Sequence, residues 1–217
     1  MPGSTPKTRG AGRQWLRLRR FDDRRCAAFL CGVDEVGRGP LAGPVVAAAV
    51  ILPPKAKLPG TDDSKRLRAS ERERLALAIT ACARAHAVAG VDSTTIDRVN
   101  IRVATFHAMR AAIAGLAIAP DLVLVDGFPV PDLLFRHEPV VGGDHLSLSI
   151  AAASILAKVH RDRLMDEYHA LYPEYGFDRH RGYGTAEHLA ALRRHGPCPI
   201  HRLSFAPTRL AAQLTCI

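Results

Sequence analysis

Apolar runs along the chain predict the strands of an α/β protein. Residues 30–33, 45–52 and 86–91 are short apolar stretches with polar or turn-forming residues around them. The second run is apolar at successive positions, which predicts a strand buried on both faces, and Pro53-Pro54 ends it. Three strands in succession predict an antiparallel meander.

Helical spacing of apolar residues predicts two helices around the third strand. Ser70 and Glu73 have the spacing of a capping box, so the first helix is predicted to begin there. Ser93 or Thr94 is predicted to cap the second, and Gly115 to follow its last turn. The apolar positions of this second helix are Ile96, Val99, Val103, Phe106 and Ile113.

The second half of the chain adds two strands and a long helix. Residues 122–125 are continuously apolar, as in a buried parallel strand, and a short fifth strand is predicted before Gly142. Ser147 is predicted to open a long helix that ends at Tyr172-Pro173, and short helical pieces follow. The pattern therefore predicts a mixed five-stranded sheet covered by helices.

Composition narrows the class of protein. A chain of 217 residues with 47% hydrophobic residues is long enough for one domain with a small appendage. No apolar run approaches the ~20 residues that span a bilayer, so no membrane segment is predicted. The five cysteines form no CxxC pair, which argues against a disulfide framework or a zinc site and favours a reducing, cytoplasmic setting.

The charge favours a polyanionic partner. The formal net charge is +9 and the pI is about 9.8, which fits a nucleic acid without saying which one. Arginines gather in residues 1–26, where we expect a flexible basic flank in preference to a transit peptide.

Four acidic residues follow or end apolar segments and are candidate metal ligands. They are Asp34, Glu35, Asp126 and Asp144. Strand ends converge in an open α/β sheet, and four carboxylates together need cations to stay ionised. Oxygen ligands suit Mg²⁺ or Mn²⁺ better than zinc. For any one residue alone, an unrelated loop acid is the better interpretation. Neighbours on a strand face opposite sides, so Asp34 and Glu35 share a site only if the strand ends or bulges there.

The chain resembles bacterial ribonuclease HII, the type 2 ribonuclease H, over residues 30–205. The matching motifs, in order, are GVDEVGRGPLAGP at 32–44, DSK at 63–65, VDG at 125–127, GD at 143–144, SIAAASILAK at 149–158 and GYGT at 182–185. The resemblance implies an RNase H-like fold with a catalytic domain at 27–172. A small C-terminal helical extension at 173–217 would complete the substrate site.

The resemblance also implies roles for the acids. Asp34 would bridge two divalent cations, Mn²⁺ or Mg²⁺. Asp144 would complete the site of the ion that activates water, and Glu35 and Asp126 would hold the other ion.

Further residues are expected to bind the substrate. The turn of Gly37, Arg38 and Gly39 would read a ribose 2′-hydroxyl through its peptide groups, although on its own it is an ordinary tight turn. Tyr183 would pack on the sugar beyond the scissile phosphate, with burial in a C-terminal core as the alternative. In the loop at 63–65, Ser64 and Lys65 would contact phosphates.

Other polar residues receive weaker interpretations. For Lys158 and Arg161 a solvated helix face is preferred. The family usually has lysine at the position of Arg181. His145, beside Asp144, is a candidate for tuning the acidic site, whereas His180 and His188 are expected in surface or core roles.

The expected activity is metal-dependent hydrolysis of the RNA strand of RNA–DNA hybrids. Cleavage 5′ of ribonucleotides embedded in duplex DNA is also expected, leaving 5′-phosphate and 3′-hydroxyl ends, with roles in primer removal and ribonucleotide excision. We expect a monomer. Ribonuclease HIII is a rival, but it usually has an extra N-terminal domain and lacks the Gly-Arg-Gly turn. A non-catalytic hybrid-binding module is disfavoured because clustered acids without metals would repel a polyanion.

Overall fold

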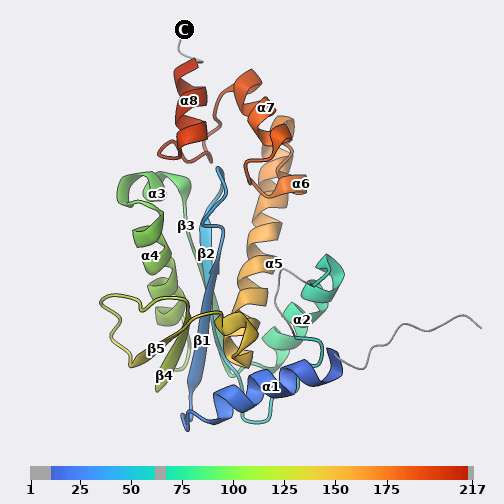
Figure 1. Cartoon of the computed structure of the whole chain (residues 1–217), viewed down its shortest axis with the longest axis vertical. Coiled ribbons are helices and arrows are strands. Elements are labelled where there is room, and N and C mark those ends of the chain that lie inside the picture. Colours follow the sequence, from blue (N-terminus) through green and yellow to red (C-terminus); the bar gives the residue numbers. More distant parts are fainter. Residues whose placement is uncertain (1–10, 62–66, 215–217) are drawn as a thin grey trace, which may run out of the picture. The chain divides into compact units, whose positions relative to one another are not determined.

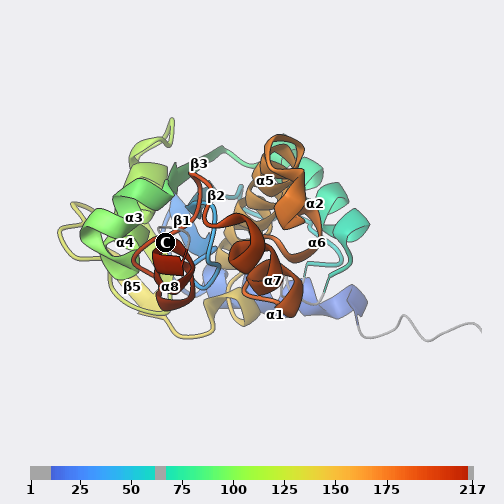
Figure 2. The same ribbon diagram turned by 90° about the horizontal axis from the view of Figure 1, so that it is seen from above.

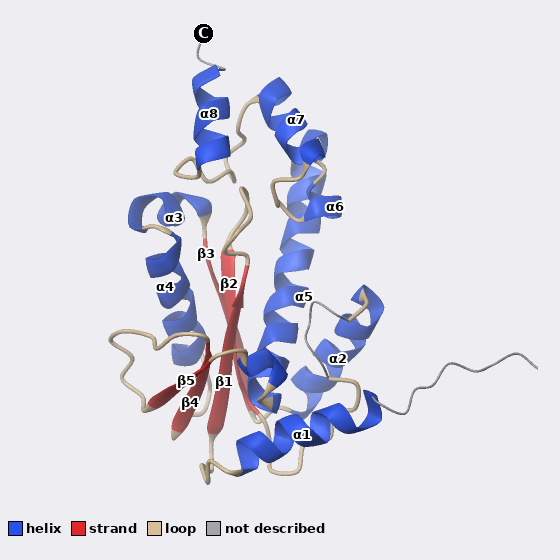
Figure 3. Cartoon of the chain, in the orientation of Figure 1, coloured by secondary structure: helices blue, strands red, loops and turns tan. Residues whose placement is uncertain are grey.

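A computed structural model describes residues 11–61 and 67–214, which form a mixed five-stranded sheet flanked by helices (Figures 1 and 3). The strand order is β3-β2-β1-β4-β5. The strands are β1 (Leu30–Val36), β2 (Val45–Ile51), β3 (Ala85–Val91), β4 (Leu122–Asp126) and β5 (His137–Val140). The predicted α/β class is confirmed. The first three strands of the chain also lie next to one another in the sheet, as predicted.

Ten helical segments accompany the sheet in the described residues. The α-helices are α1 (Ala11–Asp23), α2 (Ala69–Cys82), α3 (Ser93–Val99), α4 (Ile101–Ala114), α5 (Leu148–Leu171), α6 (Phe177–His180), α7 (Ala186–His195) and α8 (Ala206–Leu214). Two short 3₁₀ helices, η1 (Gly143–His145) and η2 (Pro173–Tyr175), lie on either side of α5 in the sequence.

The chain divides into two compact units, each assembled from three segments. The first unit comprises residues 1–34, 49–86 and 116–156, and the second comprises 35–48, 87–115 and 157–217. One boundary falls between Asp34 and Glu35. The division of the chain at residues 26 and 172, expected from the resemblance, stays a prediction.

Parallel strand pairing organises the first unit. β1 pairs with β4 from Leu30 opposite Leu122 to Val33 opposite Val125, and β4 pairs with β5 as far as Asp126 opposite Val140. Both pairs are parallel, which confirms the prediction of a buried parallel strand in β4. A small apolar cluster forms beside this ladder and consists of Leu122, Leu124, Val140 and Ile150, with Phe21, Ala27 and Leu30 packed against it.

Helix α5 begins very close to β1. A Cβ atom added at Gly32 would stand 2.1 Å from the carbonyl carbon of Ser149, so glycine alone fits. The alanines at 151–153 are fully buried, as the prediction of a close-packed helix start requires. Ser147 accepts the N–H of Ile150 through its Oγ at 3.2 Å, which confirms Ser147 as the residue that opens the helix.

The predicted flexible flank contains a helix. Residues 11–23 form α1 (Figure 1), and Leu18 on this helix is fully buried. The Asp22 carboxylate accepts the backbone N–H and the hydroxyl of Ser149, both at 2.9 Å, so it satisfies a free donor at the start of α5. Burial raises the pKa of Asp22. Residues 1–10 of the predicted flank lie outside the described residues.

The start of α2 differs from the prediction. The helix begins at Ala69, and the N–H of the preceding Arg68 donates to the Glu71 carboxylate at 3.0 Å. Ser70 therefore lies inside the first turn, and Glu71 takes the place expected of Glu73. Glu71 and Glu73 lie two residues apart, so the sequence allows two starting positions for this helix.

The helix predicted from residue 93 or 94 onward is two helices. Asp92, and not Ser93 or Thr94, caps α3 by accepting the Thr95 N–H at 2.7 Å. Asn100 then breaks the run with a φ of 71°, and its side chain caps α4. Gly115 follows the last turn as predicted but has a right-handed φ of −78°; a side chain there would crowd Ala87 at 3.2 Å.

The second unit has its own core, built largely from the C-terminal helices. The buried residues are Leu41, Ala42, Met165, Tyr175, Phe177, Leu192 and Ala211. Helices α7 and α8 lie side by side there (Figures 1 and 2). The long helix α5 ends at Leu171, which confirms the predicted stop at Tyr172-Pro173.

Candidate active site

Two of the predicted metal ligands lie on adjacent parallel strands of the first unit. One step beyond the Val33–Val125 pair, the register sets Asp34 of β1 beside Asp126 of β4. Asp34 also faces the same side of β1 as Gly32, which is the side that α5 covers. The two carboxylates therefore project to one face of the sheet.

β1 extends past Asp34 and Glu35 and ends at Val36, and Gly37 follows with a φ of 90°. The boundary between the two compact units falls between these two neighbours. That Asp34 and Glu35 share one site stays a prediction.

Asp144 joins Asp126 through the turn that follows β5. The N–H of Gly143 donates to Oδ1 of Asp126 at 2.6 Å, and Asp144 is the next residue, on η1. A Cβ atom at Gly143 would stand 2.5 Å from Cδ1 of Ile150, so glycine permits this close approach. The first unit thus gathers three aspartates, two of which are buried: Asp34 is 5% exposed and Asp144 is 8% exposed.

These aspartates suit a hard divalent cation by their chemistry. Buried carboxylates need a positive partner, and their oxygens are the ligands that Mg²⁺ and Mn²⁺ favour. Within residues 11–61 and 67–214, no group of three His, Cys, Asp or Glu side chains is arranged to hold a metal ion. His145 Nε2 lies 3.9 Å from Oδ1 of Asp144, within reach for the tuning role predicted for it.

Glu35 lies in the second unit beside the predicted substrate turn. Its Oε1 is 3.4 Å from Nη1 of Arg38, whose side chain is about half exposed. The Glu35 side chain is only 14% exposed, so solvent reaches this pair mainly from the Arg38 side.

A buried arginine shapes the glycine turn. Arg202 is fully buried and donates to the carbonyls of Gly37, at 2.5 Å, and Arg38, at 2.9 Å. It also donates to the Gly43 carbonyl at 2.8 and 3.0 Å. Gly37 has a φ of 90°, which glycine adopts without strain.

A second buried arginine supports the same turn. Arg161 donates to the carbonyls of Ala42, Pro44 and Arg181 at 2.9 to 3.1 Å. Its Nε lies 2.2 Å from the position of a Cβ on Gly37, so a side chain there would collide. The predicted solvated position for Arg161 is wrong, because the helix face that carries it is covered.

Burial lowers the pKa of both guanidinium groups, to about 10 for Arg161 and about 9 for Arg202. Both therefore stay charged at neutral pH. The acceptors of both guanidinium groups are neutral backbone carbonyls and not carboxylates. Their positive charge beneath the turn is therefore not neutralised by these bonds. Nearby, Lys158 is half-buried and bonds Asp162 at 2.6 Å, so it does not lie on a fully solvated face either.

Tyr183 packs on the glycine turn. Its Cε1 lies 3.6 Å from the Cβ position of Gly39, and the residue is 45% exposed. The loop that carries it is fastened by the N–H of Leu41, which donates to the Gly182 carbonyl at 2.8 Å. The second unit thus brings together two elements that were predicted separately, the Gly-Arg-Gly turn and Tyr183.

The remaining predicted residues divide into three groups. Ser64 and Lys65 lie outside the described residues. His180 and His188 are buried, as one of their two expected roles requires. Arg181 donates to the Asp162 carbonyl at 3.1 Å and pairs with the Asp166 carboxylate, so its charge is engaged by α5. Arg202 was not predicted, because no motif in its stretch of sequence marks it as a site residue.

The chain is similar in sequence to known proteins over most of its length. The ribonuclease HII family profile matches residues 31–208. Ribonuclease HII of Burkholderia vietnamiensis is 56% identical over 203 residues, 94% of each chain. Ribonuclease HII of Syntrophobacter fumaroxidans is 58% identical over 181 residues, 83% of this chain and 78% of that one.

Solved structures share the fold. The ribonuclease H2 of Pyrococcus horikoshii superposes with a TM-score of 0.72 at 25% identity, over 85% of this chain and 97% of that one. A ribonuclease HIII solved with Mn²⁺ gives 0.66 at 21% identity, over 100% of this chain and 77% of the other, which shows the fold alone. In the described part of the chain, no helix is long and apolar enough to cross a membrane.

Proposed function

The chain belongs to the ribonuclease HII family, and from this premise we propose how its residues hydrolyse the RNA strand of RNA–DNA hybrids. It is a ribonuclease H, a phosphodiester hydrolase that depends on divalent metal. The observation that carries the proposal is the placement of Asp34 and Asp126 on adjacent parallel strands, with Asp144 joined to Asp126 through Gly143.

The proposed metal ligands are the three aspartates and Glu35, which follows Asp34 in the chain. Two cations, Mg²⁺ or Mn²⁺, would activate a water molecule and stabilise the leaving oxygen. Asp34 would touch both, Asp144 the ion on the water side, and Glu35 and Asp126 the other. The ribonuclease HIII structure that contains Mn²⁺ supports this choice of metal.

The turn of residues 37–39 is proposed to recognise the ribose. A trans peptide directs its N–H away from its C=O. Because Arg202 draws the carbonyls of Gly37 and Arg38 inward, the N–H groups of Arg38 and Gly39 point away from it. Two fixed donors beside Tyr183 suit a 2′-hydroxyl, the group that distinguishes RNA from DNA.

Tyr183 is proposed to select the sugar that follows the ribonucleotide. An aromatic face packs well on a deoxyribose, whereas a 2′-hydroxyl there would crowd it. Cleavage would fall 5′ of an embedded ribonucleotide and leave 5′-phosphate and 3′-hydroxyl ends. Primer removal and ribonucleotide excision in the cytoplasm, by a monomer, would be the roles of such an enzyme.

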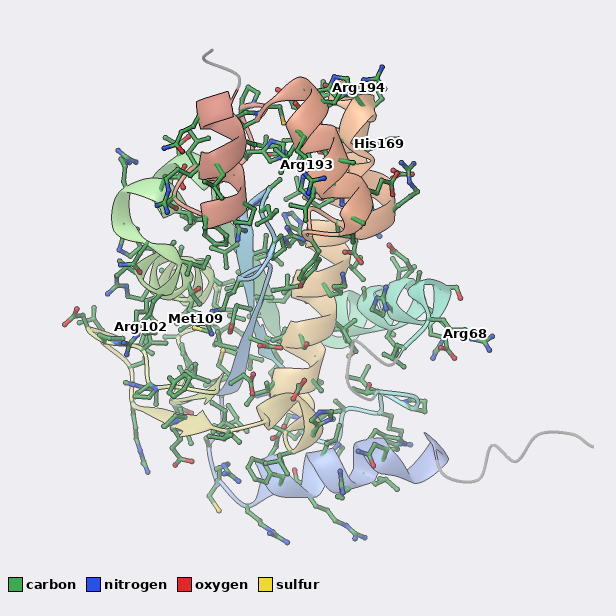
Figure 4. The ribbon with its side chains drawn as sticks, turned by 45° about the horizontal axis from the view of Figure 1, so that its top comes forward. Arg68, Arg102, Met109, His169, Arg193 and Arg194 are labelled. Carbon is green, nitrogen blue, oxygen red and sulfur yellow. The ribbon has the colours of Figure 1, made fainter. Side chains whose placement is uncertain are left out.

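Exposed arginines support binding of the polyanionic strands. Arg193 and Arg194 are exposed on the last turn of α7, and Arg102 is exposed on α4 (Figure 4). Their charges are available to phosphates, and such contacts supply most of the sequence-independent affinity for nucleic acid.

The test compares substrates and metal. Purified protein is incubated with a labelled RNA–DNA hybrid, the same RNA single-stranded, and the same RNA in an RNA duplex, each with Mg²⁺, with Mn²⁺ and with EDTA. We expect cleavage of the hybrid alone, and only with metal. Binding of the hybrid without cleavage under every condition would instead identify a hybrid-binding module.

A further inference from the structure

A chain of buried histidines lies behind Tyr183 in the second unit. His188 on α7 is fully buried and His201 is 2% exposed. Their Nε2 atoms are 3.0 Å apart, which is hydrogen-bonding distance. Phe177 packs on both rings, so water is kept from this contact.

The hydrogen bonds around these rings fix where each proton lies. The backbone N–H of Cys198 donates to Nδ1 of His201 at 2.9 Å, so that nitrogen is the acceptor. The Cys198 Sγ lies 3.1 Å from the same nitrogen, where its S–H can also donate, and the Cys198 carbonyl lies 3.3 Å away and accepts the backbone N–H of His201. With Nδ1 accepting the Cys198 N–H, His201 carries its proton on Nε2 and donates it to Nε2 of His188.

The same direction of hydrogen-bond donation leads from His188 to Tyr183. With its Nε2 acting as acceptor, His188 carries its proton on Nδ1, which lies 2.9 Å from the Tyr183 carbonyl. The bonds thus run one way, from the Cys198 N–H through two neutral rings to the Tyr183 carbonyl. Burial lowers the pKa of both histidines to about 4, and for His201 the neighbouring His188 adds to the effect, so both are neutral in the working range of pH.

Hydrogen bonds hold the backbone on both sides of the Tyr183 Cα atom, and the relay supplies the one from His188 to the carbonyl. Its carbonyl also accepts the Thr185 N–H at 2.8 Å, and its own N–H donates to the His180 carbonyl at 2.9 Å. The ring that this backbone carries lies against Gly39. A change in the relay is therefore transmitted to the ring that faces the substrate turn.

We propose that His188 and His201 are positioning residues for the reaction, whose one-way hydrogen-bond relay fixes Tyr183 for substrates with a ribonucleotide followed by deoxyribose. The inference rests on the proposed role of Tyr183. It adds that neither histidine touches substrate, and that the donor on Nδ1 of His188 is the group that matters.

Two substitutions of His188 separate this donor from the rest of the side chain. In His188→Asn the amide nitrogen stands near the place of Nδ1 and keeps the bond to the Tyr183 carbonyl. In His188→Gln the amide reaches the place of Nε2 and the bond to Tyr183 is lost. Gln is the better helix former, so a purely structural role would favour Gln in α7.

Each variant is assayed on a DNA duplex with one ribonucleotide, for kcat, KM and melting temperature. We expect the Gln variant to lose roughly 10²-fold in kcat with little change in KM, because a displacement of about 1 Å in an active site costs that much. The Asn variant should stay within about threefold of wild type. Equal kcat values, or losses that follow the melting temperatures, would overturn the relay.

Tyr183→Ala separates the role proposed for Tyr183 from the role proposed for the histidine relay. If its removal leaves cleavage of the same duplex unchanged, the role proposed for Tyr183 fails. If Tyr183→Ala impairs cleavage and the two His188 variants do not differ, the relay alone fails.

A measurement on the unmodified protein tests the relay without any risk of misfolding. Long-range ¹H–¹⁵N spectra of the histidine side chains at neutral pH should show His201 protonated on Nε2 and His188 protonated on Nδ1. The opposite tautomer at either residue would contradict the direction of the relay.

Discussion

Asp34 is the residue on which the proposed chemistry depends most, because it is buried beside Asp126 and faces the side of the sheet that α5 covers. Asp34→Asn keeps the shape and removes the charge. Cleavage should fall by about 10³-fold or more, since metal-assisted charge stabilisation is worth several kcal/mol. Hybrid binding should persist, because phosphate contacts dominate it.

The same variant has a readout that needs no substrate. Wild-type protein should melt at a higher temperature when Mg²⁺ or Mn²⁺ is added, because ligands that bind the folded state stabilise it. Asp34→Asn should lose most of this shift. An unchanged shift together with near-normal turnover would remove Asp34 from the metal site.

Arg202 tests whether the glycine turn depends on buried charge. Arg202→Lys keeps a cation but cannot serve three carbonyls with a planar fork. Each buried carbonyl left without a donor costs about 1–3 kcal/mol, so urea unfolding should show a loss of that order at least. The matched control is Arg209→Lys, at an exposed position of α8, which should change stability by less than about 0.5 kcal/mol.

The site acids could be predicted from the sequence and the buried arginines could not, for one physical reason. An acid at the end of an apolar run is unusual, so Asp126 and Asp144 were found. An arginine on a helix or in a loop is expected in solvent, so nothing distinguished Arg161 or Arg202 from surface residues. Their burial depends on carbonyls more than 100 positions away in the sequence.

At the scale of elements, Asn100 sets the break between α3 and α4. Its side chain accepts the N–H groups of Arg102 and Val103 at 3.0 and 3.1 Å while its backbone is left-handed. Asn100→Ala should cost about 1–2 kcal/mol, since both the cap and the tolerance for this φ are lost. Asn100→Gly should cost less, because glycine accepts the conformation. Urea unfolding should give the highest midpoint for the wild type, a lower one for Asn100→Gly and the lowest for Asn100→Ala. Equal midpoints would contradict this prediction.

The histidine relay gives α7 a pH-dependent stability with a definite sign. His188 and His201 have a folded pKa of about 4, below the ordinary 6.5, so between these values the unfolded chain binds more protons. Stability should therefore rise with pH across this window, by at most about 1.4 kcal/mol per pH unit for each histidine. Urea unfolding at pH 5.0 to 6.5 measures the slope. His201→Gln should reduce it, and an unchanged slope would contradict the assignment.

Element boundaries followed from the sequence where one signal dominated. The continuous apolar run of β4 and the Tyr172-Pro173 stop of α5 were each unambiguous. Competing signals misled elsewhere: Asp92, Ser93 and Thr94 are all good caps, and the helical spacing of apolar residues continues across Asn100. Helix α1 was not predicted, because the many arginines around Leu18 made this segment look solvent-exposed. In addition, the partner of Asp22 is Ser149, which is distant in the sequence.

At the scale of the whole molecule, the sheet and its flanking helices were predicted from periodicity, and the family from its motifs. The division into two compact units could not be predicted, because each unit is drawn from three separated segments. One unit carries the aspartates and the other carries Glu35, the glycine turn and Tyr183.

Product mapping on a DNA duplex with one embedded ribonucleotide tests the central claim most directly. The account predicts a single metal-dependent cut 5′ of the ribonucleotide by the wild-type enzyme, leaving 5′-phosphate and 3′-hydroxyl ends, and a loss of roughly 10²-fold in rate for Tyr183→Ala with little loss of binding. Failure of the wild type to cut this duplex, alongside good cleavage of a long RNA–DNA hybrid, would contradict it.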